Sequence, residues 1–488
     1  MTSVIGRRRV TPMRMAPRVD VVLKSRKSEY RSLLVAGPLV AGIVLGMALG
    51  VGPLATASAV GALLVAIVAP YAGLAILAFM APLVPPPTIP APGFDSILVG
   101  TILLGCVYRL PIDRPHLRVR PPLLLLIGFV LYVTVQQLPE MLAGYASIDD
   151  HNVGFLFFQL LSGVGAVVAA GYLLNGRSPY PVLVMATAGA ALVAVITLGA
   201  YGAARVALPL VNLVAPSTDL GRATGTFSNP NYLGTFAALM VVATVSLSMV
   251  TRSPLPRILL VFTAVVLTVA VGLSLSRGAM VATLVGLAVL LAARSRALAV
   301  TFLGGGILTA VLIYPAFVQW RLENLLGSAT PRAYVIMNES DDSRLTGILA
   351  GPQLFLSSPI VGVGFGHFVP LSVTVSGSLT PINAHNWFLT VLAEQGLVGA
   401  TLLVLMGVVL IAKLRTRPHA PRAVGYGVLG ALAAGSLFLE PPTSFQMLAS
   451  PAMILVAALI ADWGSDRGTE SGSTVATPTG SPATLGAG

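Results

Sequence analysis

Long apolar segments alternate with short polar ones along most of the chain. Apolar runs of roughly 17–25 residues are candidates for membrane-spanning helices. Because Gly52-Pro53 and Pro70 interrupt one nearly continuous stretch, some of the first runs can belong to a single helix. The pattern therefore predicts an all-α polytopic membrane protein with about 12–14 spans. The apolar runs lie at about 33–50, 54–70, 71–86, 95–109, 121–138, 153–174, 180–200, 229–250, 258–275, 278–293, 297–316, 386–412, 423–439 and 444–461.

The composition agrees with this prediction. Hydrophobic residues make up 56% of the 488 residues, and charged residues make up only 9%. A soluble chain carries about a quarter charged residues. The single cysteine, Cys106, lies in an apolar run and cannot form an intrachain disulfide. Cysteine usage therefore indicates nothing about the redox compartment.

The two ends of the chain are polar. Residues 1–32 contain nine Lys and Arg, and the tail at 462–488 is rich in Ser, Thr, Gly and Pro. A signal peptide cleaved after Ala55–Ala59 is one interpretation of the start. The basic region is long and apolar segments follow it directly, which favours an uncleaved first span. We expect a basic cytoplasmic segment at 1–32 and a disordered cytoplasmic tail at 462–488.

The distribution of basic residues explains the net charge of +12. Cytoplasmic segments of membrane proteins carry an excess of Lys and Arg. With the N-terminus in the cytoplasm, 23 of the 29 Lys and Arg lie in inner segments and no lysine lies outside. Topology therefore accounts for the charge without a nucleic-acid partner, and it predicts cytoplasmic N- and C-termini. The outer basic residues are Arg205, Arg222, Arg277, Arg321, Arg332 and Arg344.

The predicted outer side carries two sizeable loops, 201–228 and 317–385. The stretch GRATGTFSNPNYLG leads from the first loop into an apolar run. Its Asn229-Pro230-Asn231 is typical of a helix start, with Asn as the cap and Pro in the first turn. Helix N-termini attract anions, and Arg222 lies a few residues upstream. An ordinary connection between loop and helix is equally consistent with these residues.

Arg277 lies in LSLSRGAM, between two apolar runs with almost no loop around it. A charge near the hydrocarbon boundary usually faces a partner or a water-filled cavity. This favours a functional role for Arg277. The alternative is an arginine whose side chain reaches out to lipid headgroups.

Alternating glycines mark the stretch SSPIVGVGFGHF, at Gly362, Gly364 and Gly366. A dinucleotide-binding loop would need a surrounding βαβ unit and a following acidic residue, and neither is present. A closely packed backbone that can approach a ligand fits the glycines better. We expect no role for His367 in this stretch.

The stretch AHNWFLTVLAEQGLVGA combines a histidine with two glycines. On a regular helix with about 100° per residue, Gly396 and Gly399 fall within about 40° of the direction of His385. The spacing predicts one helical stripe, with His385 at the outer end and the glycines at a close helix contact. A lone histidine at a helix end is more often a cap or a core residue than a catalytic one.

Together these motifs resemble the O-antigen ligase and O-antigen polymerase superfamily of bacterial envelope glycosyltransferases. The resemblance rests on R-x-x-G-x-F-x-N-P-N from Arg222, S-x-S-R-G from Ser274, P-x-x-G-x-G-x-G-x-F from Pro359 and H-N-x9-G-x-x-G from His385. It covers roughly residues 200–410. The implied domain is a GT-C-like ligase domain at 201–461, which follows an N-terminal membrane bundle at 33–200.

The resemblance implies a function and a site. Similar proteins transfer a glycan from a polyprenyl-diphosphate carrier to a glycan or lipid acceptor at the outer face of the bacterial plasma membrane, without metal or nucleotide cofactor. The resemblance assigns His385 as the base and Arg222 and Arg277 to the diphosphate, with Arg344 as a looser match. The supporting positions are Asn229, Asn231, Gly364, Asn386 and, weakly, Glu440.

Alternative functions remain open. A ligase and a repeat-unit polymerase share these motifs and differ in the acceptor, which the sequence does not identify. A transporter or a flippase for lipid-linked oligosaccharides is a third class. Such a protein should carry charged or broken helices at mid-membrane in corresponding halves. Here the unusual charges gather at the predicted outer helix ends, which disfavours transport.

Overall fold

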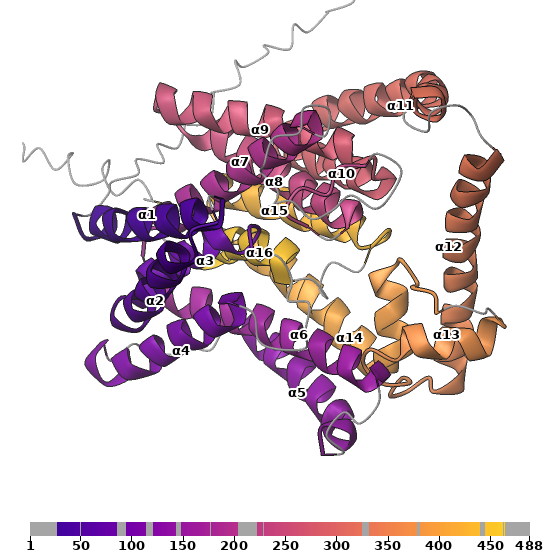
Figure 1. The fold of residues 1–488 in the computed structure, drawn as a ribbon, viewed down its shortest axis with the longest axis horizontal. Helices are drawn as coiled ribbons and strands as arrows, with labels where there is room; N and C mark the ends of the chain where they lie inside the picture. Colours follow the sequence, from indigo (N-terminus) through magenta and orange to yellow (C-terminus); the bar gives the residue numbers. More distant parts are fainter. Residues whose placement is uncertain are drawn as a thin grey trace, which may run out of the picture.

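The structure is a computed structural model, and it describes residues 27–48, 50–84, 94–113, 121–142, 148–175, 177–203, 222–227, 229–324, 331–377, 381–439, 445–461 and 463. Within these ranges the chain forms helices and no strand. The helices are α1 (Lys27–Ala48), α2 (Gly52–Val68), α3 (Pro70–Met80), α4 (Phe94–Asp113), α5 (Pro121–Leu142), α6 (Ile148–Leu173), α7 (Tyr180–Ala203), α8 (Pro230–Val250), α9 (Pro254–Ser274), α10 (Arg277–Ala292), α11 (Arg296–Asn324), α12 (Pro331–Ser357), α13 (Phe368–Ser376), α14 (Trp387–Arg415), α15 (His419–Gly435) and α16 (Phe445–Ile460). Figure 1 shows α1 to α4 on the left and α12 and α13 on the right.

The predicted all-α, multi-span architecture is confirmed for the described residues. Each of the fourteen apolar runs coincides largely with one helix, from α1 to α11 and from α14 to α16. Of the described helices, six are long and apolar enough to cross a membrane, namely α5 to α9 and α14. Shorter apolar stretches lie in α1, α2, α3, α10, α11 and α16. The expected segments before residue 27 and after residue 463 lie outside the described residues.

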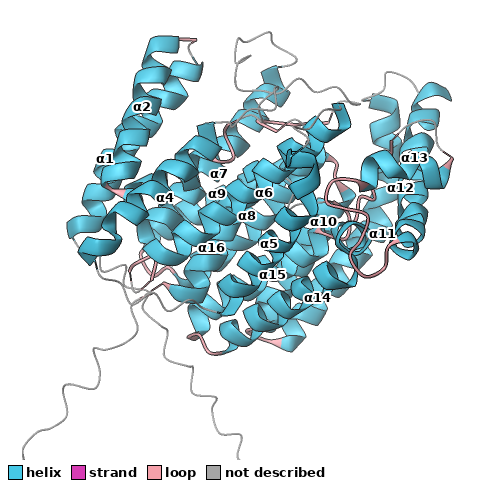
Figure 2. Cartoon of the chain, turned by 90° about the horizontal axis from the view of Figure 1, so that it is seen from below, coloured by secondary structure: helices cyan, strands magenta, loops and turns pink. Residues whose placement is uncertain are grey.

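The main hydrophobic core of the described residues extends from Ala36 in α1 to Trp463 after α16, and smaller clusters lie around the glycine-rich stretch and between α12 and α14. α8 lies deep in the main core and packs against α7, α9, α10, α15 and α16, and Figure 2 shows α8 in the middle of the assembly. Small or apolar residues lie on every side of α8, which is typical of a helix that is buried all round. The core therefore joins the parts before and after residue 200.

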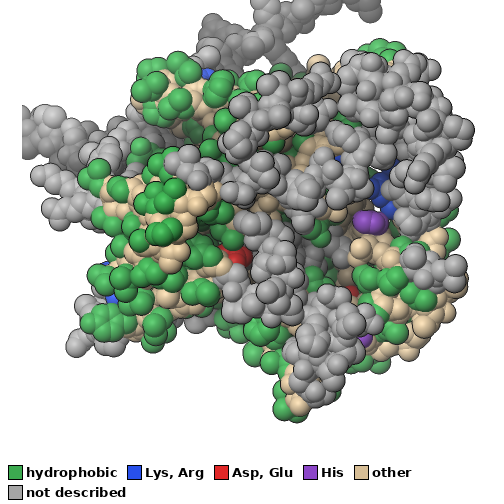
Figure 3. Space-filling model, viewed as in Figure 1, with side chains coloured by type: hydrophobic (Ala, Val, Ile, Leu, Met, Phe, Trp, Pro, Cys, Tyr) green, Lys and Arg blue, Asp and Glu red, His purple; other side chains and the backbone are tan. Residues whose placement is uncertain are grey.

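Large apolar side chains are exposed on the peripheral helices. Examples are Leu64 of α2, Leu131 of α5, Val265 of α9 and Val408 of α14. Figure 3 shows such side chains over much of the left of one face. Exposed apolar patches of this extent would be unfavourable in water and suit a lipid environment. The surface thus agrees with a protein that crosses the membrane several times.

The stretch 317–385, expected as an outer loop, is largely helical where it is described. α11 continues to Asn324, and α12 and α13 follow. Hydropathy did not indicate these helices because α12 carries several charged residues, including Arg344. In Figure 1, α12 runs along the right edge between the end of α11 and α13. α12 packs against α13 and α14, which brings it to the start of α14.

Candidate functional site

The first two sequence motifs meet where α8 begins and α9 ends. The side-chain oxygen of Asn229 accepts a hydrogen bond of 2.8 Å from the amide of Asn231, and Pro230 is the first helical residue. The predicted helix start is confirmed. Arg222 donates from Nε to the carbonyl of Ser274 at 2.9 Å and from Nη2 to Oδ1 of Asn231 at 2.6 Å. Its guanidinium group therefore joins the two motifs.

Arg277 is the first residue of α10, and its side chain is exposed. α9 ends at Ser274, its C-cap residue Leu275 has a left-handed φ of 52°, and the hydroxyl of Ser276 caps α10. The connection is as short as the sequence predicted. This connection can lie against α8 because α8 has a glycine, Gly234, at the point of contact. A Cβ atom on Gly234 would lie 2.5 Å from Oγ of Ser274. Arg277 thus lies at a helix N-terminus, a position that favours anions.

The turn after α15 connects the start of α10 to the start of α14. A Cβ atom at Gly278 would lie 2.5 Å from Cβ of Phe438, so these two residues are in close contact. In the same turn, the carbonyl of Ser436 accepts a hydrogen bond of 2.8 Å from the amide of Trp387. The arginine motif of α10 and the histidine motif of α14 therefore lie on either side of one turn.

His385 precedes α14 and does not lie within it. Its backbone is left-handed, with a φ of 49°, and Asn386 caps the helix by accepting a hydrogen bond of 3.1 Å from the amide of Leu389. The predicted single stripe of His385, Gly396 and Gly399 is therefore wrong. The left-handed residue turns the chain before the helix starts, and α14 is itself broken at Gly396. Asn386 has a structural role as the cap.

Arg344 acts on His385 because α12 packs closely against the segment that carries the histidine. A Cβ atom at Gly347 would lie 2.3 Å from the carbonyl oxygen of Asn383, and one at Gly351 would lie 2.4 Å from Leu389. Residues three and four apart share one helix face, so Arg344 belongs to this contact face. Burial lowers the pKa of His385 to about 4, and the positive charge of Arg344 adds to the shift. Figure 3 shows histidine and basic side chains together on the right.

Gly396 interrupts α14 with φ 60° and ψ −160°, a conformation that only glycine adopts readily. The glycine loop, residues 358–367, supplies hydrogen bonds that the interruption removes from the helix. The amides of Val363 and Gly364 donate to the carbonyls of Ala393 and Glu394, both at 3.0 Å. The carbonyls of Pro359 and Ile360 accept from Leu397 and Val398, at 2.9 and 3.2 Å.

The predicted close packing of the glycine loop is thereby confirmed. Gly362, Gly364 and Gly366 all have positive φ angles, of 78°, 107° and 79°. A Cβ atom at Gly362 would lie 2.2 Å from the carbonyl group of Glu394. The glycines therefore allow backbone to lie against backbone, and the third and fourth motifs form one structural unit.

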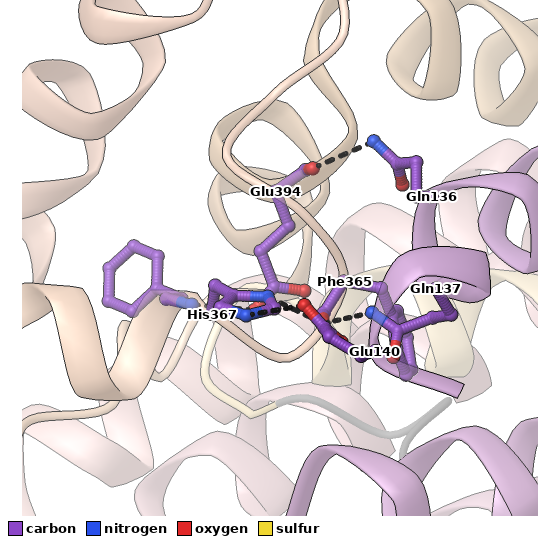
Figure 4. Close-up of polar contacts among 7 residues, drawn as sticks. Gln136, Gln137, Glu140, Phe365, His367 and Glu394 are labelled. Carbon is purple, nitrogen blue, oxygen red and sulfur yellow. Dashed lines mark hydrogen bonds and ion pairs between the residues drawn. The ribbon is translucent and has the colours of Figure 1, made fainter. Parts of the chain in front are cut away.

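α5 contributes polar side chains to this unit that the sequence analysis missed. Gln137 donates to the carbonyl of Phe365 at 2.9 Å. His367, for which no role was expected, lies with Nε2 2.9 Å from Oε1 of Glu140. Figure 4 shows these side chains of α5 facing the loop. The sequence could have indicated these contacts, because Gln136, Gln137 and Glu140 form a polar group in a largely apolar helix.

An apolar cavity of about 600 Å³ lies among α4, α5, α6, α14 and α16. Its lining includes Trp387 at the start of α14, two residues after His385, and Lys413 near the end of the same helix. Asn175 and Arg177 also line it, and most other lining residues are Leu, Val, Ala and Ile. The cavity therefore follows much of the length of α14.

Glu440, a weak match to the family pattern, lies outside the described residues. Among the described residues, no group of three or more His, Cys, Asp and Glu side chains could hold a metal ion. Metal independence nevertheless stays a prediction.

Comparison with known proteins identifies the central segment. Residues 262–404 match the family model described as O-antigen ligase. This match supports the resemblance of the central segment to the O-antigen ligase and polymerase superfamily. The O-antigen ligase match runs from within α9 to within α14, and it includes Arg277, Arg344 and His385 but not Arg222. No curated protein matches the chain. The match broadly supports a membrane glycosyltransferase of the ligase or polymerase type.

Proposed function

We propose that the protein transfers a glycan from a polyprenyl-diphosphate carrier to an acceptor hydroxyl group at the outer face of a bacterial plasma membrane. The observation that carries this proposal is the meeting of the motifs at the starts of α8, α10 and α14. Arg222 is bonded to Ser274, and the turn after α15 contacts both Gly278 and Trp387. These contacts support one site that contains Arg277 and the His385 segment.

In this proposal the arginines stabilise the leaving group. A diphosphate gains negative charge as the bond to the sugar breaks, and preorganised donors favour that charge. The planar guanidinium fork matches phosphate oxygens with two parallel hydrogen bonds. Arg277 adds the favourable end of a helix dipole. We assign Arg222, Arg277 and Arg344 to diphosphate binding.

His385 acts as the general base. The acceptor oxygen forms a bond to the anomeric carbon of the donor sugar, and the bond from that carbon to the diphosphate oxygen breaks. His385 takes the hydroxyl proton, and the carrier diphosphate leaves with the bonding electrons. Because the pKa of His385 is lowered to about 4, its ring is neutral near physiological pH. A bound diphosphate would offset the charge of Arg344 and raise that pKa towards the range in which a base is effective.

The apolar cavity supports a lipid-linked donor. Because Trp387 lines one end of it, a polyprenyl tail can lie along α14 while the diphosphate stays near His385. A repeat-unit polymerase would use the same donor and the same residues with a growing glycan as acceptor. In both cases we propose an uncleaved first span, cytoplasmic termini and no requirement for metal.

The experiment compares donor binding with glycan transfer in purified variants whose membrane insertion has been checked. His385→Ala should keep donor binding and lose transfer by roughly 10²–10⁴-fold, because only proton transfer is lost. Arg277→Ala should lose both. Arg257→Ala is a matched control, because Arg257 is exposed at the opposite end of α9. Normal turnover by His385→Ala would refute the base assignment, and dependence of transfer on Mg²⁺ or Mn²⁺ after EDTA would refute the arginine-only scheme.

A further inference from the structure

The break in α14 at Gly396 is stabilised by the glycine loop on one side and by α5 on the other. The hydroxyl of Tyr132 lies 2.7 Å from the carbonyl of Val361 and 3.0 Å from that of Gln395. The amide of Gln136, one turn further along α5, donates to Val361 and, at 3.3 Å, to the carbonyl of Glu394. Figure 4 shows Gln136 reaching Glu394. Tyr132 and Gln136 therefore bind carbonyl groups of both the glycine loop and the interrupted helix.

The carboxylate of Glu394 holds the start of α13 next to the break in α14. Its Oε1 accepts a hydrogen bond of 2.9 Å from the amide of Phe368, the first residue of α13. The N-cap residue of α13, His367, makes no capping hydrogen bond with its side chain. Glu394 thus supplies from α14 the cap that α13 lacks, and its negative charge suits a helix N-terminus. Burying a carboxylate is unfavourable unless it is hydrogen-bonded, and Glu394 is only 5% exposed.

The first part of α14, from Trp387 to Gln395, is a short helical rod between His385 and the break. Its His385 end is held by the cap at Asn386 and by the bond between Trp387 and Ser436. Its other end is held by the glycine loop and by the polar anchor, which we define as Tyr132, Gln136 and Glu394. A shift of the anchored end would move the rod and, with it, the histidine.

We propose that the polar anchor positions His385 for proton transfer, so that Tyr132, Gln136 and Glu394 are positioning residues for the reaction. This inference rests on the proposed function of His385. Misplacing a catalytic group by about 1 Å can cost about 10²-fold in rate, even when the change lies far from the chemistry. The anchor residues touch neither donor nor acceptor in this proposal, so substrate affinity should change little.

Tyr132→Phe is the primary test, because it removes one hydroxyl and keeps the ring. We expect kcat to fall by about 10–10²-fold while KM for the donor changes less than about twofold. Hydrogen exchange at the amides of Leu397 and Val398 should become faster, since their bonds to the glycine loop are loosened. Thr134→Val is the matched control. Thr134 lies on the same helix, and its hydroxyl donates to the carbonyl of Val130 within that helix, so kcat and exchange should match the wild type.

A second pair of variants separates positioning from general stability. Glu394→Gln keeps an oxygen that can accept from Phe368 and should retain most of kcat, whereas Glu394→Leu should lose it. Faster exchange with an unchanged kcat in Tyr132→Phe would refute the positioning role. Unchanged exchange and unchanged kcat would refute the anchor itself. Failure of the proposed function is recognised separately, by normal turnover of His385→Ala.

Discussion

Arg222 donates a hydrogen bond of 2.6 Å from Nη2 to the side-chain oxygen of Asn231, which lies in the first turn of α8. A second bond, from Nε to the carbonyl of Ser274, fixes the plane of the guanidinium group. An arginine has five N–H donors in a rigid fork. These two bonds therefore orient the fork at the helix start, where an anion is favoured.

Arg222→Lys should lower glycan transfer by about 10²–10³-fold, because an ammonium group keeps the charge but loses the fork. Asn231→Ala should cost less, roughly 10–10²-fold, as expected for one hydrogen bond from a charged donor that orients the fork. Turnover of lipid-linked donor in proteoliposomes measures both. Arg252→Lys, at an exposed position before α9, controls for loss of a surface arginine. If Arg222→Lys keeps wild-type turnover, the fork geometry has no role.

The pH dependence tests the contact between α12 and the histidine segment. The pKa of His385 is lowered to about 4 by burial and by the charge of Arg344, so the neutral base persists as the pH falls. We expect kcat/KM to be level down to about pH 5 and to decline near pH 4. Arg344→Gln removes the positive charge, so the pKa of His385 should rise towards its ordinary value of 6.5. The decline of kcat/KM at acidic pH should therefore begin at a higher pH than in the wild type. If kcat/KM of Arg344→Gln declines over the same acidic pH range as kcat/KM of the control Arg257→Gln, the charge of Arg344 does not influence His385.

The sequence predicted the helices better than the site. Lipid-facing and buried helices must both be apolar, so hydropathy locates them, and Asn229-Pro230 marks the start of α8 correctly. The break at Gly396 was not predicted, because Glu394 and Gln395 before it are an isolated polar pair in a helix that is apolar on average. Glycine serves both close helix packing and positive φ, and spacing alone does not separate these uses.

The supports of the site are distant in the sequence. Tyr132 and Val361 are 229 residues apart, and no local pattern pairs them. Arg344 is different, since Gly347 and Gly351 follow it on one helix face and form a recognisable contact stripe. That stripe could have predicted a partner segment for α12, although not that the partner would be the segment with His385.

The topology is tested by labelling in intact cells. Thr374 is exposed on α13, in the stretch expected outside, and Ser253 is exposed before α9, in a stretch expected inside. In a Cys106→Ala background, Thr374→Cys should react with an impermeant maleimide in intact cells, whereas Ser253→Cys should react only after permeabilisation. The reverse pattern would place the histidine segment in the cytoplasm, where the proposed outer-face transfer is impossible.

Gly396→Ala tests whether α14 is broken as described. A Cβ atom there would lie 2.5 Å from the carbonyl oxygen of Ile360, and the φ of 60° with ψ of −160° disfavours any other residue. The strain alone should cost about 1–3 kcal/mol, so thermal unfolding in detergent should occur at lower temperature and transfer should fall. Gly407→Ala is the control on the same helix, because the added carbon would meet no described atom within 4 Å apart from the adjoining backbone of α14. Alanine should stabilise the helix there by about 0.5–1 kcal/mol. Equal stability of the two variants would mean that α14 runs unbroken through residue 396, and the glycine loop could not then be paired with it.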